Sequence, residues 1–204
     1  MNTRIAGLAL SGLLVLAAVG SVAGSASETG SGKPLYDENG RLRFPGDYRD
    51  WVFLSSGLNM SYSDGPQDAS MNMFGNTFAP RAAYAAFKVT GRWPDKTVLI
   101  IENRVAGTKG SINKRGQFQR ADTMGFEAHV KDEARFKGGW GFFSFGNEEK
   151  SASQIPYTAS CYGCHQAHAA ADTTFVQFYP TLLPIATKLK TLNPAYVAEE
   201  AARK

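Results

Sequence analysis

The two cysteines of this 204-residue chain stand three positions apart, and a histidine directly follows the second. The stretch Cys161-Tyr162-Gly163-Cys164-His165 therefore reads Cys-x-x-Cys-His. On a helix, positions i, i+3 and i+4 lie on one face, so both thiols and the imidazole can address one planar ligand. This spacing is the attachment motif of a c-type haem, in which the thiols bond to the vinyl groups and the imidazole binds the iron.

Other readings of the same residues stay open at this point. A disulfide or a redox pair needs only the two thiols, with the histidine a neighbour by chance. A structural zinc site needs further ligands, but only His129 and His168 remain, and His168 is too close in sequence for the usual two-pair pattern. A thioredoxin-like pair would follow a strand early in a domain. We predict one covalent haem c bound by Cys161, Cys164 and His165, with His165 as the metal ligand.

Residues 1–27 are predicted to be a secretory signal peptide. Arg4 gives a positive start, residues 5–22 form an apolar run with small residues, and residues 22–27 offer cleavage sites. A single membrane anchor is the alternative, but no basic cluster follows the run. Because bacteria attach c-type haem outside the cytoplasm, we expect a periplasmic protein with no stable membrane insertion after cleavage. One haem domain is expected over residues 28–204.

Composition and charge suit a globular domain and disfavour a nucleic-acid binder. Hydrophobic residues make up 43% of the chain, which is enough for a sizeable core at this length. The formal charge is +4, but the basic residues are spread out and form no run interleaved with aromatic residues. We therefore expect no nucleic-acid partner.

The hydrophobic pattern predicts an α+β domain with several antiparallel strands and a few helices. One helix is expected from Pro80 to a cap at Gly91, and the haem motif lies on another helix near the C-terminus. Residues 63–70 read as a loop, and residues 173–189 as an amphipathic helix interrupted by two prolines. Strands are expected at residues 51–55, 71–78, 97–102, 125–130 and 140–145.

The place of the motif in the chain separates the kinds of c-type cytochrome. Small electron-transfer cytochromes carry it near the start, with an axial methionine downstream, whereas no methionine follows His165 here. Four-helix cytochromes c-prime carry it near the C-terminus, but their upstream chain shows long helical patterns instead of strands. We predict a five-coordinate iron with an apolar, open distal side, which argues against simple electron carriage.

The stretches around the motif resemble the cytochrome P460 family, which includes the β-sheet cytochromes c-prime-beta. The matching pieces are residues 48–52, 83–84, 90–95, 97–98, 125–128 and 130–132, Trp140 with Phe142, the haem motif and residues 175–180. Each piece is weak alone, but their order is specific. The resemblance implies a mainly antiparallel β domain, usually a homodimer, with a five-coordinate haem.

That family divides by function. Its P460 members oxidise hydroxylamine and carry a lysine cross-linked to the haem, whereas the c-prime-beta members lack this bond and bind nitric oxide or other small gases. The lysine stands just before the Glu of the Thr-Val strand, where this chain has Ile101 before Glu102. The pattern favours the type without the cross-link, with a small diatomic or nitrogenous ligand. The alternatives are a hydroxylamine-oxidising enzyme and an electron-transfer cytochrome with a redox partner protein.

The remaining candidates are acidic, imidazole and aromatic side chains. The resemblance makes Glu127 the candidate catalytic residue, because it matches a family acid that can relay protons; the alternative is a carboxylate paired with Lys or Arg. His129 lies on the same strand face, and a surface or hydrogen-bonded histidine is favoured over a sixth ligand. His168 is expected at the surface. Core aromatics, some of them candidates to cap the haem, are Phe74, Phe78, Phe142, Phe143 and Phe145.

Overall fold

The computed structural model describes residues 32–61 and 72–203. The predicted signal peptide, residues 1–27, and the loop predicted over residues 63–70 lie outside the described residues. Within the described ranges, no helix is both long and apolar enough to cross a membrane.

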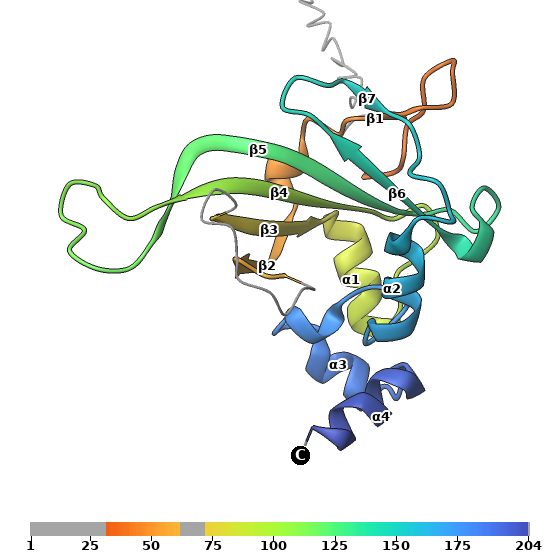
Figure 1. Cartoon of the computed structure of the whole chain (residues 1–204). Helices are drawn as coiled ribbons and strands as arrows, with labels where there is room; N and C mark the ends of the chain where they lie inside the picture. Colours follow the sequence, from red (N-terminus) through yellow and green to blue (C-terminus); the bar gives the residue numbers. More distant parts are fainter. Residues whose placement is uncertain (1–31, 62–71, 204) are drawn as a thin grey trace, which may run out of the picture.

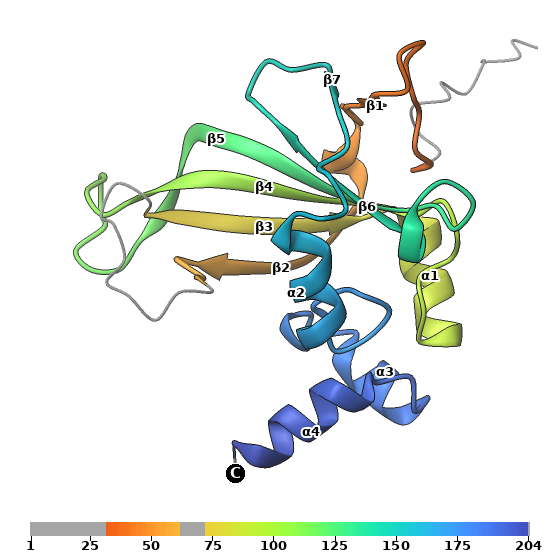
Figure 2. The same ribbon diagram turned by 45° about the vertical axis from the view of Figure 1, so that its right-hand side comes forward.

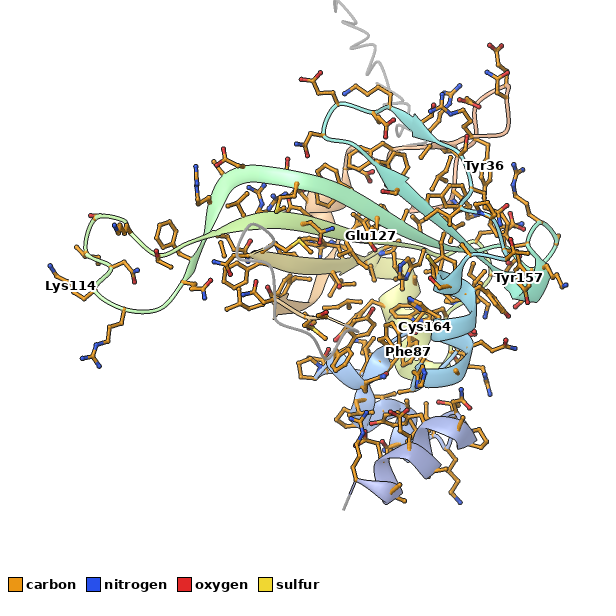
Figure 3. All side chains as sticks on the ribbon, viewed as in Figure 1. Tyr36, Phe87, Lys114, Glu127, Tyr157 and Cys164 are labelled. Carbon is orange, nitrogen blue, oxygen red and sulfur yellow. The ribbon has the colours of Figure 1, made fainter. Side chains whose placement is uncertain are left out.

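Five antiparallel strands form the main sheet, and strands that follow one another in the chain are neighbours in the sheet. In order they are β2 (Val52–Leu58), β3 (Met73–Ala79), β4 (Val98–Gly107), β5 (Phe118–Lys131) and β6 (Trp140–Phe145). A small second sheet pairs β1 (Leu42–Arg43) with β7 (Ser151–Ala152). The hairpin between β4 and β5 extends beyond the other strands and carries Lys114 near its tip (Figure 3). The predicted, mainly antiparallel α+β fold is confirmed.

Four α-helices of the described chain lie on one side of the main sheet, and the β1–β7 pair lies on the other (Figures 1 and 2). The helices are α1 (Arg81–Thr90), α2 (Ser160–His168), α3 (Leu183–Lys188) and α4 (Pro194–Ala202). The described residues also include three short 3₁₀ turns: η2 (Tyr48–Asp50), η4 (Lys137–Gly139) and η5 (Val176–Phe178). The haem motif lies on α2, so the candidate site is on the side of the main sheet that the helices cover.

Side-chain alternation along the strands gives the main sheet two apolar faces. Toward the helices, Leu99 and Phe142 pack into one core with residues of α1, α2 and α3. Toward the β1–β7 pair, Ile100 and Phe143 pack into a second core with Leu42. Along strand β6, Trp140 and Phe142 face the first core and Phe143 and Phe145 face the second, so the sheet separates the two cores.

Helix α1 begins and ends where the sequence predicts. Pro80 is its N-cap, with a φ of −55° that the pyrrolidine ring imposes. Gly91 caps the other end with a left-handed φ of 70°, and its N–H donates to the carbonyl of Phe87 at 2.7 Å. A side chain at Gly91 would place its Cβ 2.4 Å from Thr191 Oγ1, so the position also needs glycine sterically.

The C-terminal region differs from the prediction of one interrupted helix over residues 173–189. Asp172 and Thr173 both have left-handed φ values, 48° and 58°, so the chain turns there instead of entering a helix. Pro180 then separates η5 from α3, because it has no N–H to donate and restricts the residue before it. Pro184 lies in the first turn of α3, where its missing N–H costs nothing.

Candidate haem site

A cavity of about 650 Å³ lies between the helix-facing side of the main sheet and helix α2. The strands form one wall, from Ser55 on β2 to Ser144 on β6, and α2 forms the other together with residues 175–179. Figure 3 shows Glu127 on the sheet side and Cys164 on α2. The volume falls within the roughly 300–1,000 Å³ that pockets for small molecules and cofactors occupy.

The three chemically distinctive residues of the motif all line this cavity. Cys161, Cys164 and His165 come from one face of α2, as the i, i+3, i+4 spacing predicts. Both thiols are free and half-buried, so the disulfide reading is not realised in this structure. Two thiols and one imidazole thus face a single space of cofactor size.

The imidazole of His165 is held in one tautomer by the backbone. Its Nδ1 lies 3.0 Å from the carbonyl oxygen of Thr173, which can only accept, so Nδ1 carries the proton and Nε2 is left with its lone pair. Burial lowers the pKa of His165 to about 4, and the hydrogen bond to Thr173 opposes this only in part. The ring is therefore neutral near pH 7, as a metal-binding imidazole must be.

Apolar rings and a second histidine surround His165. The ring centroids of Phe175, Phe142 and His129 lie 4.2, 4.8 and 4.7 Å from its own. His129 was expected to be a surface or a hydrogen-bonded histidine, and its exposed fraction of only 7% shows that the surface position is wrong. It pairs with Leu99 on β4 and Phe142 on β6, and this row of the sheet is covered by α2. Burial, with the nearby His165, holds the pKa of His129 well below its ordinary value.

The sheet wall contains a row of directly paired residues that crosses all five strands and begins with Ser55, which pairs with Thr77. Thr77 pairs in turn with Ile101, Ile101 with Glu127, and Glu127 with Ser144, and all five residues line the cavity. The candidate Glu127 is therefore part of the site, and its Oε1 accepts a hydrogen bond of 3.2 Å from Asn103 Nδ2. The alternative expectation was an ion pair between Glu127 and a Lys or Arg, whereas the contact observed is with the amide of Asn103. Ile101 stands in the middle of the row.

The surface of the cavity is mainly apolar but includes a polar part. Apolar groups contribute most of its surface. A polar strip nevertheless crosses the sheet wall, because Thr77, Asn103 and Ser144 stand beside Glu127. Of these four residues, only Glu127 was predicted from the sequence to belong to the site. The strip gives the site hydrogen-bonding groups that a purely apolar wall lacks.

The structure separates the predicted core aromatics into those that pack away from the cavity and one that lies against the haem motif. Of the five candidates, Phe142 lies against the haem motif. Phe78, Phe143 and Phe145 pack in the core on the opposite face, although Phe143 also borders the cavity. Phe74 alternates with cavity-lining Met73 and Gly75, so it points to the opposite face as well. Alternation explains these outcomes, because only every second residue of a strand can face one wall.

Three lining aromatics were missed by the sequence reasoning. Phe175, Phe178 and Tyr179 follow the motif and form the part of the wall next to α2. They lay inside the stretch interpreted as a helix, where no residue was given a role in the site. They lie within residues 175–180, one of the stretches that resemble the cytochrome P460 family, and this resemblance was the available indication that they belong to the site.

His168 behaves as predicted. It is exposed, and its Nδ1 lies 3.1 Å from Glu199 Oε2 on α4. Over residues 32–61 and 72–203, no group of three or more His, Cys, Asp and Glu side chains is arranged to hold a metal ion. The haem motif brings two thiols and an imidazole with a free Nε2 to the cavity, which is the donor set of a c-type haem, and the imidazole of His129 lines the same cavity.

The fold and this cavity together define a haem-binding cytochrome built on an antiparallel sheet. The sequence model of the family described as Cytochrome P460 matches residues 45–176, well over half of the chain and including the whole motif. The chain belongs to the cytochrome P460 family, and this membership supports an iron-containing haem as its cofactor. A search of curated proteins gave no significant match.

Proposed function

We propose that the chain is an exported mono-haem c-type cytochrome that binds nitric oxide or a similar small diatomic ligand at an open iron position. The observation that carries this proposal is the place of Ile101 in the sheet wall, paired with Thr77 and Glu127. Its aliphatic side chain has neither nitrogen nor sulfur. It can therefore form neither the cross-link of the hydroxylamine-oxidising relatives nor a bond to iron.

The motif residues would hold the cofactor. Each thiol of Cys161 and Cys164 adds to one vinyl group: a sulfur–carbon bond forms, and the thiol hydrogen passes to the other vinyl carbon, so no oxidant is needed. His165 is the proposed iron ligand through Nε2, because its Nδ1–H is committed to Thr173. When bound, the haem supplies the iron to which a small diatomic ligand attaches.

The sheet wall would act on such a ligand through hydrogen bonds. Asn103 donates to Glu127, and both side chains line the cavity. This contact orients the Glu127 carboxylate and leaves its other oxygen to accept a proton or a hydrogen bond. Ile101 beside it presents only hydrocarbon, which limits the water that can compete for the same space.

Hydroxylamine oxidation is the second candidate, and Glu127 is the observation that favours it. A carboxylate on the wall of the cavity can accept the protons that such an oxidation releases. If this reading holds, Glu127→Gln lowers turnover by roughly 10²–10⁴-fold, the usual contribution of a positioned acid or base. An electron-transfer role with a redox partner protein requires a second strong iron ligand, for which His129, Met60 and Met73 are the cavity-lining candidates.

Export, location and assembly are proposed on sequence grounds. The signal peptide over residues 1–27 would direct the remaining domain, residues 28–204, to the periplasm, where c-type haem attachment takes place. A homodimer is proposed from the family resemblance. Size-exclusion chromatography with light scattering on the exported protein tests the dimer, and N-terminal sequencing tests the cleavage.

The haem-loaded protein is expected to be high-spin and five-coordinate, and its ferrous form to bind nitric oxide. Resonance Raman and magnetic circular dichroism, before and after nitric oxide, measure this. His129→Ala should leave the spin state unchanged, with exposed His168→Ala as the matched histidine control. A low-spin resting spectrum that His129→Ala, Met60→Ala or Met73→Ala converts to high-spin would contradict the proposal.

The haem is also expected to carry no bond to strand β4. A proteolytic digest followed by mass spectrometry should give one haem peptide, containing Cys161 and Cys164, and the absorption spectrum should be that of an ordinary c-type haem. Hydroxylamine turnover with an artificial electron acceptor should stay at the level of the buffer. A haem peptide joined to a β4 residue or a nearby lysine, together with steady turnover, would establish the enzyme instead.

A further inference from the structure

The turn that holds His165 is itself fixed by a buried ion pair from another part of the chain. Lys131, the last residue of β5, places its Nζ 3.0 and 3.2 Å from the two carboxylate oxygens of Asp172. The side chains are 10% and 11% exposed. Lys131 also donates to the carbonyl of Trp93 at 2.8 Å, while the N–H of Trp93 donates to Asp172 Oδ2 at 2.8 Å. The mutual contacts of these three residues are called the clamp; Lys131 Nζ also lies 3.4 Å from Glu133 Oε1.

The turn needs such support because its backbone is strained. Ala171 and Thr174 pair as a β-bridge, and the two residues between them, Asp172 and Thr173, both have left-handed φ values. Aspartate tolerates this region, but a β-branched threonine adopts it rarely, because its side chain crowds the backbone there. Thr174 adds a second anchor, because its buried hydroxyl accepts a 2.9 Å hydrogen bond from Trp93 Nε1.

The strained residue is the one that contacts the haem motif. The carbonyl of Thr173 accepts the hydrogen bond from His165 Nδ1, and its direction depends on the left-handed conformation of that same residue. Partners of this kind orient a metal-binding imidazole and raise its basicity. If the turn relaxed, the carbonyl would swing away from the ring.

We propose that the ion pair between Lys131 and Asp172 is a positioning device for the axial imidazole, which holds the 171–174 turn so that Thr173 tunes the iron–histidine bond. This inference rests on the proposed role of His165 as iron ligand. Lys131 and Asp172 are positioning residues, since neither lines the cavity. Their contribution reaches the site through one backbone carbonyl.

The test is the iron–histidine stretching frequency in resonance Raman spectra of the ferrous, haem-loaded protein. Lys131→Met, Asp172→Asn and the double variant are compared with wild type. Lys131→Arg keeps the positive charge and is the conservative rescue. Lys96→Met is the matched control, because it removes a different lysine–aspartate pair, with Asp132, that does not touch the turn. Thermal unfolding of each variant monitors folding.

We expect the stretch to move to lower frequency in both single variants and no further in the double variant, because either change opens the same clamp. Direct charge effects would differ in sign, since one variant removes a cation and the other an anion. Lys131→Arg and Lys96→Met should keep the wild-type frequency, even where they lower the melting temperature.

An unchanged frequency in folded Lys131→Met and Asp172→Asn would overturn the inference and leave the proposed function standing. Asp172→Asn keeps the size of the side chain and tolerates the left-handed conformation, so it remains informative if Lys131→Met fails to fold. A wild-type spectrum whose iron–ligand mode is unaffected by His165→Ala would overturn both the inference and the proposed ligand. The two failures are thus distinguishable.

Discussion

The double variant Cys161→Ala/Cys164→Ala is expected to lose covalent haem completely. Both thiols line the cavity from one face of α2, and the chain has no other cysteine. Without sulfur no thioether can form, so acid–acetone extraction should remove all haem from the variant and none from the wild type. The pyridine haemochrome spectrum of the extracted protein measures the difference. Because the variant keeps His165, it can still bind haem reversibly in the same cavity.

The two single cysteine variants and a variant of the neighbouring serine are the comparisons for this test. Cys161→Ala and Cys164→Ala should each retain haem through one thioether, with an absorption band shifted by the vinyl group left unreacted. Ser160→Ala is the control, since Ser160 lines the same cavity but offers no thiol. Haem that resists extraction from the double variant would place the covalent bond elsewhere in the chain and would reopen the cross-linked reading.

The parts of the site that could be predicted from sequence are those set by local periodicity. The spacing of Cys161, Cys164 and His165 fixes their common helix face wherever the helix packs. In the same way, the two-residue period of a strand places Glu127 and His129 on one face, and puts Ile101 and Glu102 on opposite faces. These relations need no knowledge of tertiary contacts, and the structure reproduces them.

The parts that could not be predicted depend on contacts between distant segments. Alternation shows that His129 shares a face with Glu127, but only the packing of α2 over that end of the sheet makes it buried. The hydrogen bond from His165 to Thr173 depends on a turn with two left-handed residues. Asp172 is a common turn residue, but the β-branched Thr173 is not, so the sequence gives no signal for the pair. Phe175 and Phe178 reach the cavity only because this turn replaces the expected helix.

The same alternation that places Ile101 in the cavity wall sends Glu102 into the core on the opposite face. Glu102 is fully buried, and its Oε1 accepts hydrogen bonds from Tyr48 at 2.8 Å and from Arg104 at 2.8 Å, with Arg49 as a further close partner. Oε2 accepts a longer bond of 3.3 Å from Asn76. Glu102 therefore ties η2, β3 and β4 together beneath the wall that faces the cavity.

Truncating this buried carboxylate is expected to cost the protein much of its stability. Glu102→Ala leaves Arg104, whose side chain is only 18% exposed, and the Tyr48 hydroxyl without their acceptor. Breaking a buried pair on one side typically costs about 3–5 kcal/mol, a large part of the roughly 5–15 kcal/mol that holds a domain folded. Urea unfolding followed by circular dichroism measures it. Glu127→Gln is the matched control, because the exposed Glu127 on the neighbouring strand should change stability by only about 0.5 kcal/mol.

The contribution of Glu102 should also depend on pH in a definite direction. Burial alone would raise its pKa, but hydrogen bonds from Arg104 and Tyr48 and the charges of Arg49 and Arg104 outweigh burial, so the pKa lies below its ordinary value of 4.5. A lowered pKa means that the native state favours the ionised form, so this stability is present above pH 4.5 and is lost as the pH falls through the folded-state pKa.

The gap in unfolding free energy between wild type and Glu102→Gln should therefore be constant near neutrality and narrow as the pH falls below about 4.5. Glutamine keeps the shape but not the charge, so the narrowing isolates the titration of this one carboxyl. Urea unfolding curves of both proteins at pH 7, 5, 4 and 3 give the difference in unfolding free energy at each pH, in steps of about one pH unit across the titration of Glu102. A gap that stays constant or widens on acidification would show that Glu102 is not held ionised by its arginine partners.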